Sequence, residues 1–250
     1  MGQHASVCAE LGGGGNLGNH LIVEQQDYDR EEQAQFAEPD IARLTLDQQA
    51  AFEKITSAIT SQSGQTFFLH APGGTGKTFL YNTHCYHLLS QTKIVLCVAS
   101  SGIAALLLQG GQTAHSQFKI PIPCHESSVC SIPKESHLAE LICGTQLVIW
   151  DEAPMQHHHN MEAVDRTLQD VQNSDKPFGG VTFVFGGDFQ QILPVIVNSS
   201  RAQTVGACIQ YSTLWRKITV LHLCQNMWLN TTLEPERKFA EWQLEGKTHR

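Results

Sequence analysis

The stretch that decides the fold is APGGTGKT, residues 71–78. Its glycines allow the backbone to form a nest of inward-pointing N–H groups, and the apolar helical segment after it adds the positive end of a helix dipole. Lys77 is placed to reach the β- and γ-phosphates of a nucleotide, and the Thr78 hydroxyl to bind Mg²⁺. Ala71 replaces the usual first glycine, and a chance glycine-rich match is the alternative. The strand expected before the loop and the helix expected after it favour a phosphate-binding loop.

Short apolar runs and helical segments alternate on both sides of this loop. Runs that are apolar on both faces are typical of parallel strands covered by helices. This alternation predicts an α/β fold with a doubly wound parallel sheet. The expected strands are residues 66–69, 94–98, 147–150, 181–185 and 218–223. The expected helices are residues 46–61, 77–89, 103–108, 137–142 and 161–171.

Two adjacent acids, Asp151 and Glu152, follow the expected strand 147–150. Parallel strands end at one edge of the sheet, so both carboxylates would face the phosphate loop. Asp151 is expected to share Mg²⁺ with Thr78, and Glu152 to orient and deprotonate an attacking water. Taken alone, an acidic pair is more often a solvated strand end. Together with the loop, it indicates a nucleoside-triphosphate hydrolase.

Charge is distributed unevenly along the 250 residues, which carry a formal net charge of −8. Residues 1–40 hold eight acids and one base, Arg30, and therefore carry −7, whereas the rest is near neutral. Net acidity argues against a nucleic-acid partner, but a near-neutral body still allows a local basic groove. Residues 1–40 also contain four consecutive glycines and few large apolar side chains. They are expected to be a disordered or loosely attached leader.

Several other features are expected to carry no function. The eight cysteines contain no C-x-x-C pair, which favours a reducing compartment without structural zinc. Since His157, His158 and His159 are adjacent, their side chains are expected to point in different directions and to share no metal. No apolar stretch is long enough to span a membrane, and residues 1–20 lack a secretory pattern. We therefore expect an intracellular protein with no membrane partner.

Four further blocks point to one family. They are LTLDQ at residues 44–48, ASSGIAA at 99–105, GGQTAHSQFKIP at 110–121 and FGGDFQQILPV at 185–195. With the phosphate loop, they resemble the PIF-type (petite integration frequency) DNA helicases of superfamily one, including relatives carried by rolling-circle transposons. The resemblance spans about residues 41–230.

The resemblance implies a RecA-like P-loop NTPase domain over residues 41–228, with 229–250 as the truncated start of a second helicase domain. It implies ATP and Mg²⁺ as cofactors, and 5′-to-3′ unwinding of DNA in recombination, repair and telomere maintenance. The implied partners are single-stranded DNA and DNA junctions, and no obligate protein partner can be inferred. The implied location is the nucleus, with the mitochondrion as a second site.

The resemblance also assigns residues. Gln48 is implied to contact adenine, and Gln191 to sense the γ-phosphate and couple it to the DNA groove. The expected nucleotide contacts are Gln48, Gly73, Gly74, Thr75, Gly76, Lys77 and Thr78. The expected catalytic residues are Lys77, Glu152 and Gln191.

Both the 99–105 and 110–121 blocks are implied to contact single-stranded DNA. Backbone amides at a helix start can hold a strand phosphate, and an exposed aromatic ring can stack on a base. A buried Phe118 would instead belong to the core. Independently, the alternative for Asp188, which follows a glycine pair, is that it only caps a turn. The expected DNA contacts are Ser100, Ser101, Gly102, His115, Ser116, Phe118 and Lys119.

Three positions lack a positive charge that the family pattern has: Gln112, Gln190 and Trp228. An arginine at position 228 would contact the γ-phosphate, and such a cation is worth about 10³–10⁵ in rate in related phosphoryl transfers. One alternative is therefore a hydrolysis-deficient remnant that binds nucleotide and DNA. Another is an unrelated P-loop kinase, which would need a substrate lid and an acceptor site that the sequence does not show.

Overall fold

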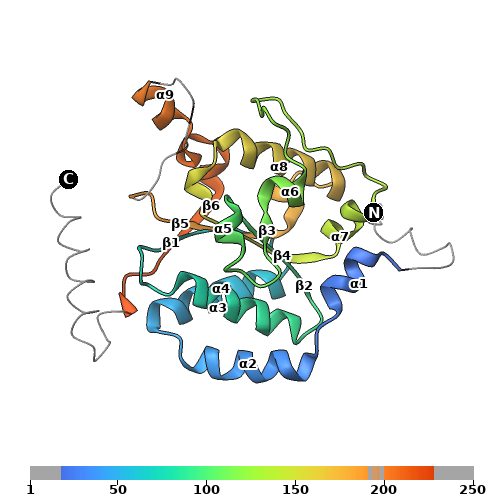
Figure 1. Cartoon of the computed structure of the whole chain (residues 1–250), viewed down its shortest axis with the longest axis vertical. Helices are drawn as coiled ribbons and strands as arrows, with labels where there is room; N and C mark the ends of the chain where they lie inside the picture. The colour runs from blue at the N-terminus through green and yellow to red at the C-terminus, as the bar shows by residue number, and fades with distance from the viewer. Residues whose placement is uncertain (1–17, 191–193, 195, 197–199, 228–250) are drawn as a thin grey trace, which may run out of the picture.

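The computed structural model describes residues 18–190, 194, 196 and 200–227 (Figure 1). Within these residues, six strands form one sheet in the order β3-β2-β4-β5-β1-β6, and every neighbouring pair is parallel. The strands are β1 (Thr66–His70), β2 (Ile94–Ala99), β3 (Gln112–Thr113), β4 (Thr145–Asp151), β5 (Thr182–Gly187) and β6 (Ile218–His222). All five expected strands are confirmed. Only the two-residue β3 was not expected.

Helices cover both faces of the sheet, which confirms the doubly wound α/β fold (Figure 1). On one face, α3 (Leu46–Thr60) and α4 (Lys77–Leu89) pack against alternate strand residues such as Leu69 and Ile149. On the other face lie α7 (His137–Cys143) and α8 (His158–Gln172), over Phe68 and Trp150. No helix in the described residues is long and apolar enough to cross a membrane.

The remaining helices are short or N-terminal. They are α1 (His20–Gln26), α2 (Arg30–Ala42), α5 (Gly102–Ala105), α6 (Ala114–Phe118) and α9 (Arg201–Gly206). Helices α5 and α6 follow the carboxyl ends of β2 and β3, at the edge of the sheet where the phosphate loop follows β1.

Helices α1 and α2 correct the expectation of a disordered leader over residues 1–40. The Asp29 side chain caps α2 by accepting the N–H groups of Glu31 and Glu32. These two acids lie in the first turn, where negative charge interacts favourably with the positive end of the helix dipole. Phe36 of α2 contacts Tyr86 of α4, with ring centroids 5.4 Å apart. A helix that packs against the body is therefore present in this acidic segment, although its composition did not indicate one. Residues 1–17 lie outside the described part of the chain.

Helix α1 is also fixed to the body. The Asn19 side chain caps α1, and its amide nitrogen donates to the His137 carbonyl oxygen at 2.6 Å and to Glu140 Oε2 at 2.9 Å. These bonds tie the start of α1 to α7. Ordered structure therefore starts with α1, before α3, which is the first helix expected from the sequence.

Candidate functional site

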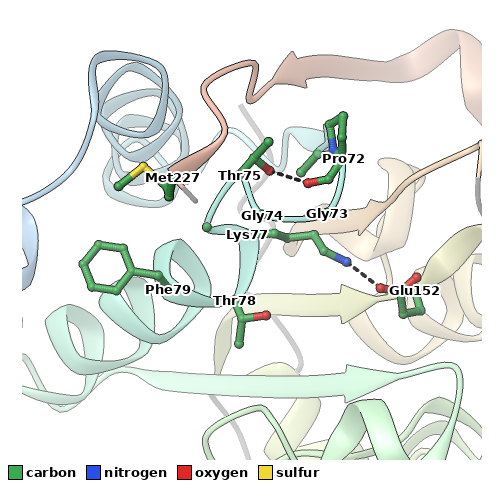
Figure 2. A pocket seen from close by; sticks show the side chains of 11 residues that line it. Pro72, Gly73, Gly74, Thr75, Lys77, Thr78, Phe79, Glu152 and Met227 are labelled. Atoms are coloured by element: carbon green, nitrogen blue, oxygen red, sulfur yellow. Dashed lines mark hydrogen bonds and ion pairs between the residues drawn. The ribbon is translucent and has the colours of Figure 1, made fainter. Parts of the chain in front are cut away.

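The phosphate loop connects β1 to α4 and lines a cavity of about 340 Å³ (Figure 2). Gly74 and Gly76 have φ of +84° and +76°, a conformation that favours glycine. A Cβ at Gly76 would overlap the Gln48 side chain, so this glycine is also required by packing. The expected loop residues come together around one cavity: Gly73, Gly74, Thr75, Gly76, Lys77 and Thr78.

Lys77 connects the loop to the acidic pair at the end of β4. Its Nζ lies 2.5 Å from Asp151 Oδ1 and 2.7 Å from Glu152 Oε1 (Figure 2 shows the bond to Glu152). Burial by itself lowers the pKa of Lys77, but the two carboxylates outweigh burial and raise the pKa above its usual value. The expectation that the acids face the phosphate loop is met by this geometry.

Glu152 has an unusual backbone, with φ of +52° and ψ of 35°. Its N–H donates to Asp151 Oδ1 at 2.9 Å. A left-handed conformation costs energy for a residue with a Cβ, and such residues gather at functional sites. The turn directs the Glu152 carboxylate into the cavity that the phosphate loop lines.

Gln48 is buried behind the phosphate loop. Its amide nitrogen donates to the Thr75 carbonyl oxygen at 2.9 Å, and its Oε1 accepts the Thr45 N–H at 3.0 Å. The second bond belongs to a capping box that starts α3. Gln48 is 1% exposed and is not among the residues that line the cavity. In the structure, Gln48 therefore supports the shape of the loop, a role that the resemblance did not suggest.

The glycine pair at the end of β5 is explained by two close neighbours. A Cβ at Gly186 would overlap the hydroxyl of Tyr81 from α4, and one at Gly187 would overlap the Pro154 ring. Asp188 Oδ1 accepts the Gln190 N–H at 3.0 Å, so Asp188 does cap a turn. Gln191, the expected γ-phosphate sensor, lies outside the described residues.

Tyr81 and Met227 are site residues that sequence reasoning missed. Burial and the nearby charges of Asp151 and Glu152 raise the pKa of Tyr81 well above its usual value, so its hydroxyl stays neutral. The Met227 N–H donates to the Gly74 carbonyl oxygen at 2.8 Å. The segment after β6 therefore passes the phosphate loop one residue before Trp228, which lies outside the described residues.

Ser100 links the first expected DNA block to the acidic pair. Its N–H donates to the Asp151 carbonyl oxygen at 3.1 Å, and its Oγ accepts the Trp150 Nε1–H at 3.3 Å. The Gln156 amide donates to the Ser100 carbonyl oxygen at 3.1 Å. Ser101 Oγ accepts the Ala104 N–H and caps α5, whereas Gly102 is exposed. The hydroxyls of this block thus serve the fold.

The second expected DNA block has both buried and exposed members. Phe118 is 0% exposed and lies 6.0 Å from Trp150 between ring centroids. The expectation that it stacks on a base is therefore wrong, because α6 turns this ring into the core. His115 is half-buried, and burial lowers its pKa, so at neutral pH it is uncharged. Ser116 and Lys119 remain exposed.

The acidic helix α1 borders this second block. Glu24 and Gln25 line a cavity of about 170 Å³ together with Ser116 and Lys119. Nothing in the sequence pattern predicted that the N-terminal segment returns to this loop, because the contact joins residues far apart in the chain. Negative charge thus lies beside the one exposed lysine of the block.

A phosphate loop between β1 and α4, with two carboxylates from β4 in contact with its lysine, defines a P-loop NTPase with a RecA-like sheet. The family model described as "PIF1-like helicase" matches residues 43–246. The chain belongs to the PIF1-like helicase family.

Curated relatives agree with this assignment. The chain is 33% identical over 136 residues to "ATP-dependent DNA helicase Pif1" of Psychrobacter sp. (strain PRwf-1), covering 54% of this chain and 20% of the relative. It is 27% identical over 178 residues to "ATP-dependent DNA helicase RRM3" of Saccharomyces cerevisiae, covering 70% of this chain and 24% of that relative. The chain thus spans about a fifth to a quarter of these relatives.

Solved structures of the same family share the fold. Unliganded Pif1 from Bacteroides sp aligns with a TM-score of 0.59 and 28% identity, covering 77% of this chain and 43% of that one. Bacteroides Pif1 in complex with ADP-AlF3 and single-stranded DNA aligns with a TM-score of 0.59 and 26% identity, covering 73% and 43%.

Proposed function

We propose that the chain is the nucleotide-binding part of an ATP-dependent DNA helicase that moves 5′-to-3′. The observation that carries the proposal is the contact of Lys77 with both Asp151 and Glu152 at the mouth of the phosphate loop. In a P-loop NTPase, a lysine, a metal-binding acid and a residue that positions water have to meet around the γ-phosphate. The family membership supports the same conclusion.

Each group at the site has a role in the proposed hydrolysis. The amides of the phosphate loop and Lys77 would bind the phosphate oxygens of ATP, and Gln48 would hold the loop in its binding shape. Thr78 and Asp151 are the residues that would hold Mg²⁺, which would neutralise charge on those oxygens. Glu152 would accept a proton from the attacking water. Gln191 would sense the γ-phosphate.

The proposed DNA surface lies at the same edge of the sheet. Ser100, Ser101 and Gly102 would offer backbone groups to a strand phosphate, and Ser116 and Lys119 would add a hydroxyl and a cation. His115 would contribute an uncharged imidazole. Since Ser100 is bonded to Asp151, Trp150 and Gln156, movement at the acids would be passed to the strand.

The same proposal includes the biological setting and the domain bounds. Residues 41–228 would form the first helicase domain, and 229–250 would begin the second. The substrates would be single-stranded DNA and DNA junctions, in recombination, repair and telomere maintenance, in the nucleus or the mitochondrion.

Binding of ATP tests the proposal. We expect Lys77→Ala to weaken binding of a fluorescent ATP analogue by at least about tenfold, or about 1.4 kcal/mol, because the variant loses a cation that contacts the phosphates. Lys134→Ala is the matched control, since Lys134 is exposed and pairs with Asp170 on the surface, away from the phosphate loop. Equal affinity of wild type and Lys77→Ala would contradict the assignment of the phosphate site.

A second candidate function is a remnant that binds nucleotide and DNA without unwinding. The sequence carries Trp228 where the family pattern has arginine, and Met227 already contacts the phosphate loop. This candidate shares the binding site and differs in its slow hydrolysis and in its lack of unwinding.

A further inference from the structure

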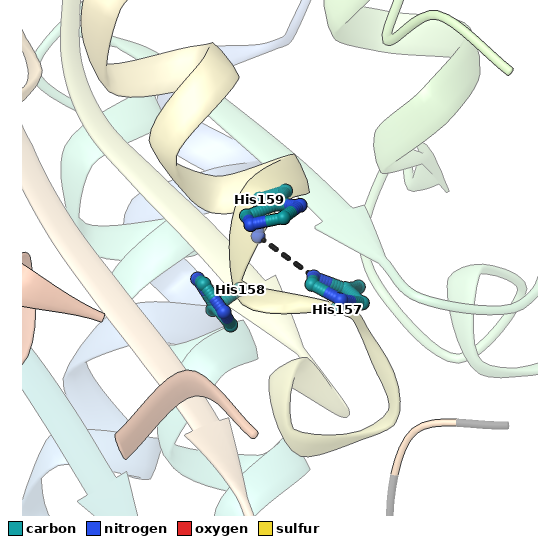
Figure 3. A group of neighbouring side chains, drawn as sticks. All are labelled: His157, His158 and His159. Atoms are coloured by element: carbon teal, nitrogen blue, oxygen red, sulfur yellow. Dashed lines mark hydrogen bonds between the residues drawn. The ribbon is translucent and has the colours of Figure 1, made fainter. Parts of the chain in front are cut away.

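Three consecutive histidines come together at the start of α8 (Figure 3). The ligand nitrogens of His157, His158 and His159 all lie within 4.8 Å of one another. The expectation that these side chains diverge is wrong for this turn. His157 is the extended N-cap residue, with φ of −65° and ψ of 136°, and α8 begins at His158. The backbone changes direction between them, which brings the cap ring to a centroid distance of 4.2 Å from His159.

A metal ion binds the lone pair of a neutral imidazole, so the hydrogen-bond partners of each ring decide which nitrogen is available to it.

His158 is oriented by a carboxylate behind it. Its Nδ1 lies 3.2 Å from Glu162 Oε1, one turn further along α8. A carboxylate only accepts hydrogen bonds, so in the neutral ring Nδ1 carries the hydrogen and Nε2 has the lone pair. Glu162 Oε1 also accepts the Ser212 hydroxyl at 2.7 Å, which fixes the carboxylate. A carboxylate that holds the far nitrogen of an imidazole orients the ring and raises its basicity as a metal ligand.

His157 is the weaker ligand of the three. Its Nδ1 accepts the His159 N–H at 3.1 Å, so in the neutral ring the hydrogen sits on Nε2. A metal at Nε2 requires that hydrogen to move to Nδ1, and the helix cap is then lost. We therefore expect His158 and His159 to bind first, with His157 completing the site.

We propose that His157, His158 and His159 bind a divalent transition-metal ion of the Zn²⁺ or Co²⁺ type, with Glu162 as a positioning residue. Imidazole nitrogen suits these ions, and water would fill the remaining coordination position. Metal–nitrogen distances of about 2.0–2.1 Å place tetrahedral ligands about 3.4 Å apart, so the side chains would have to rotate to bring nitrogens that now lie within 4.8 Å of one another to that spacing. The inference does not depend on the proposed helicase function.

Titration of the metal-free full chain with Co²⁺, followed by visible absorption, tests the site. We expect one Co²⁺ ion to bind saturably, with visible absorption bands typical of Co²⁺ coordinated by nitrogen. Added Zn²⁺ should displace the Co²⁺ and abolish these bands. His158→Asn and His159→Asn are each expected to weaken binding by about 100-fold or more, and Glu162→Gln by about tenfold. His157→Asn keeps a good N-cap residue, and its loss of affinity should be smaller than that of His158→Asn.

Three controls separate this site from other ligands. His137→Asn should leave affinity unchanged, because His137 is exposed beside His20 and reports on unspecific binding by an imidazole pair. Asp151→Asn should also leave it unchanged. Thermal melting of each metal-free variant reports on folding. A thiolate charge-transfer band, affinity that survives in a His158→Asn/His159→Asn double variant, or no saturation below about 1 mM would overturn the proposal.

Discussion

At the scale of single residues, His84 of α4 is a buried polar group that the proposed site does not use. It is 1% exposed and stacks on Phe52 of α3, with ring centroids 4.5 Å apart. Neither ring nitrogen has a hydrogen-bond partner among the described residues. Burial, with a smaller effect from His87, lowers its pKa to about 3. A buried imidazole without partners lowers the stability of the fold.

We expect His84→Leu to raise the free energy of unfolding by about 1 kcal/mol at pH 7.5, because an apolar side chain of similar volume needs no partner. The pKa of His84 is depressed in the folded chain, so below about pH 6.5 the imidazole takes up a proton in the unfolded chain but not in the folded one. The stability of the wild type therefore falls as the pH drops from about 6.5 toward about 3. That loss is about 1.4 kcal/mol per pH unit. The stability gain of the variant should therefore grow by about 2 kcal/mol at pH 5.

Urea unfolding at both pH values measures this effect. His137→Leu is the control, since a substitution at an exposed position is expected to change stability by less than about 0.5 kcal/mol. A His84→Leu variant that is less stable than wild type, with the same dependence of stability on pH, would show that the buried ring has hydrogen-bond partners in solution.

At the scale of elements, α2 shows where sequence reasoning stopped short. Apolar periodicity predicted α3, the segments between the strand-like runs predicted α4 and α8, and apolar runs predicted five strands, because burial in a parallel sheet leaves a local pattern. Helix α2 leaves little pattern, because only Gln33 and Ala37 of its 13 residues are buried and its exposed residues mix acidic, polar and apolar side chains. Its docking on α4 depends on contacts distant in sequence. The Phe118 ring was misassigned because α6 is too short to show a periodic pattern, and its burial depends on contacts with residues distant in sequence, such as Trp150.

The docking of α2 predicts that Ala37→Asp destabilises the chain. Ala37 is 3% exposed, and an unpaired carboxylate there should cost at least about 2 kcal/mol. For a domain of this size, that corresponds to a fall in Tm of about 4–8 °C. Gln35→Asp, at an exposed position of the same helix, is the matched control. Equal melting of the two variants would mean that α2 is not packed on the body.

At the scale of the whole molecule, the proposed nucleotide site and the proposed DNA surface both lie at the carboxyl edge of one sheet. The phosphate loop and the acids could be predicted from the sequence, because a parallel sheet places all its strand ends together. The additional roles of Gln48, Tyr81 and Met227 could not, since each depends on packing between distant segments. The histidine cluster was missed because its geometry depends on the backbone angles of one cap residue.

The proposed cycle predicts that this 250-residue chain hydrolyses ATP slowly and does not unwind DNA. The transition state spreads charge over the γ-phosphoryl oxygens, and Trp228 cannot supply the cation that arginine would. We expect turnover well below about 1 s⁻¹ with single-stranded DNA present. Trp228→Arg should raise the rate at least about tenfold, and Glu152→Gln should bind ATP without hydrolysing it. Wild-type turnover at about 1 s⁻¹ with unwinding of a tailed duplex would show that another group supplies the cation.

Lys77 would change partners in the proposed hydrolysis. Its ammonium group has three donor hydrogens, and two of them already meet the carboxylates of Asp151 and Glu152. Nucleotide phosphates that bind Lys77 would therefore compete with these two acids. The Glu152 carboxylate would be released from Lys77 by the same substrate whose hydrolysis it is proposed to assist.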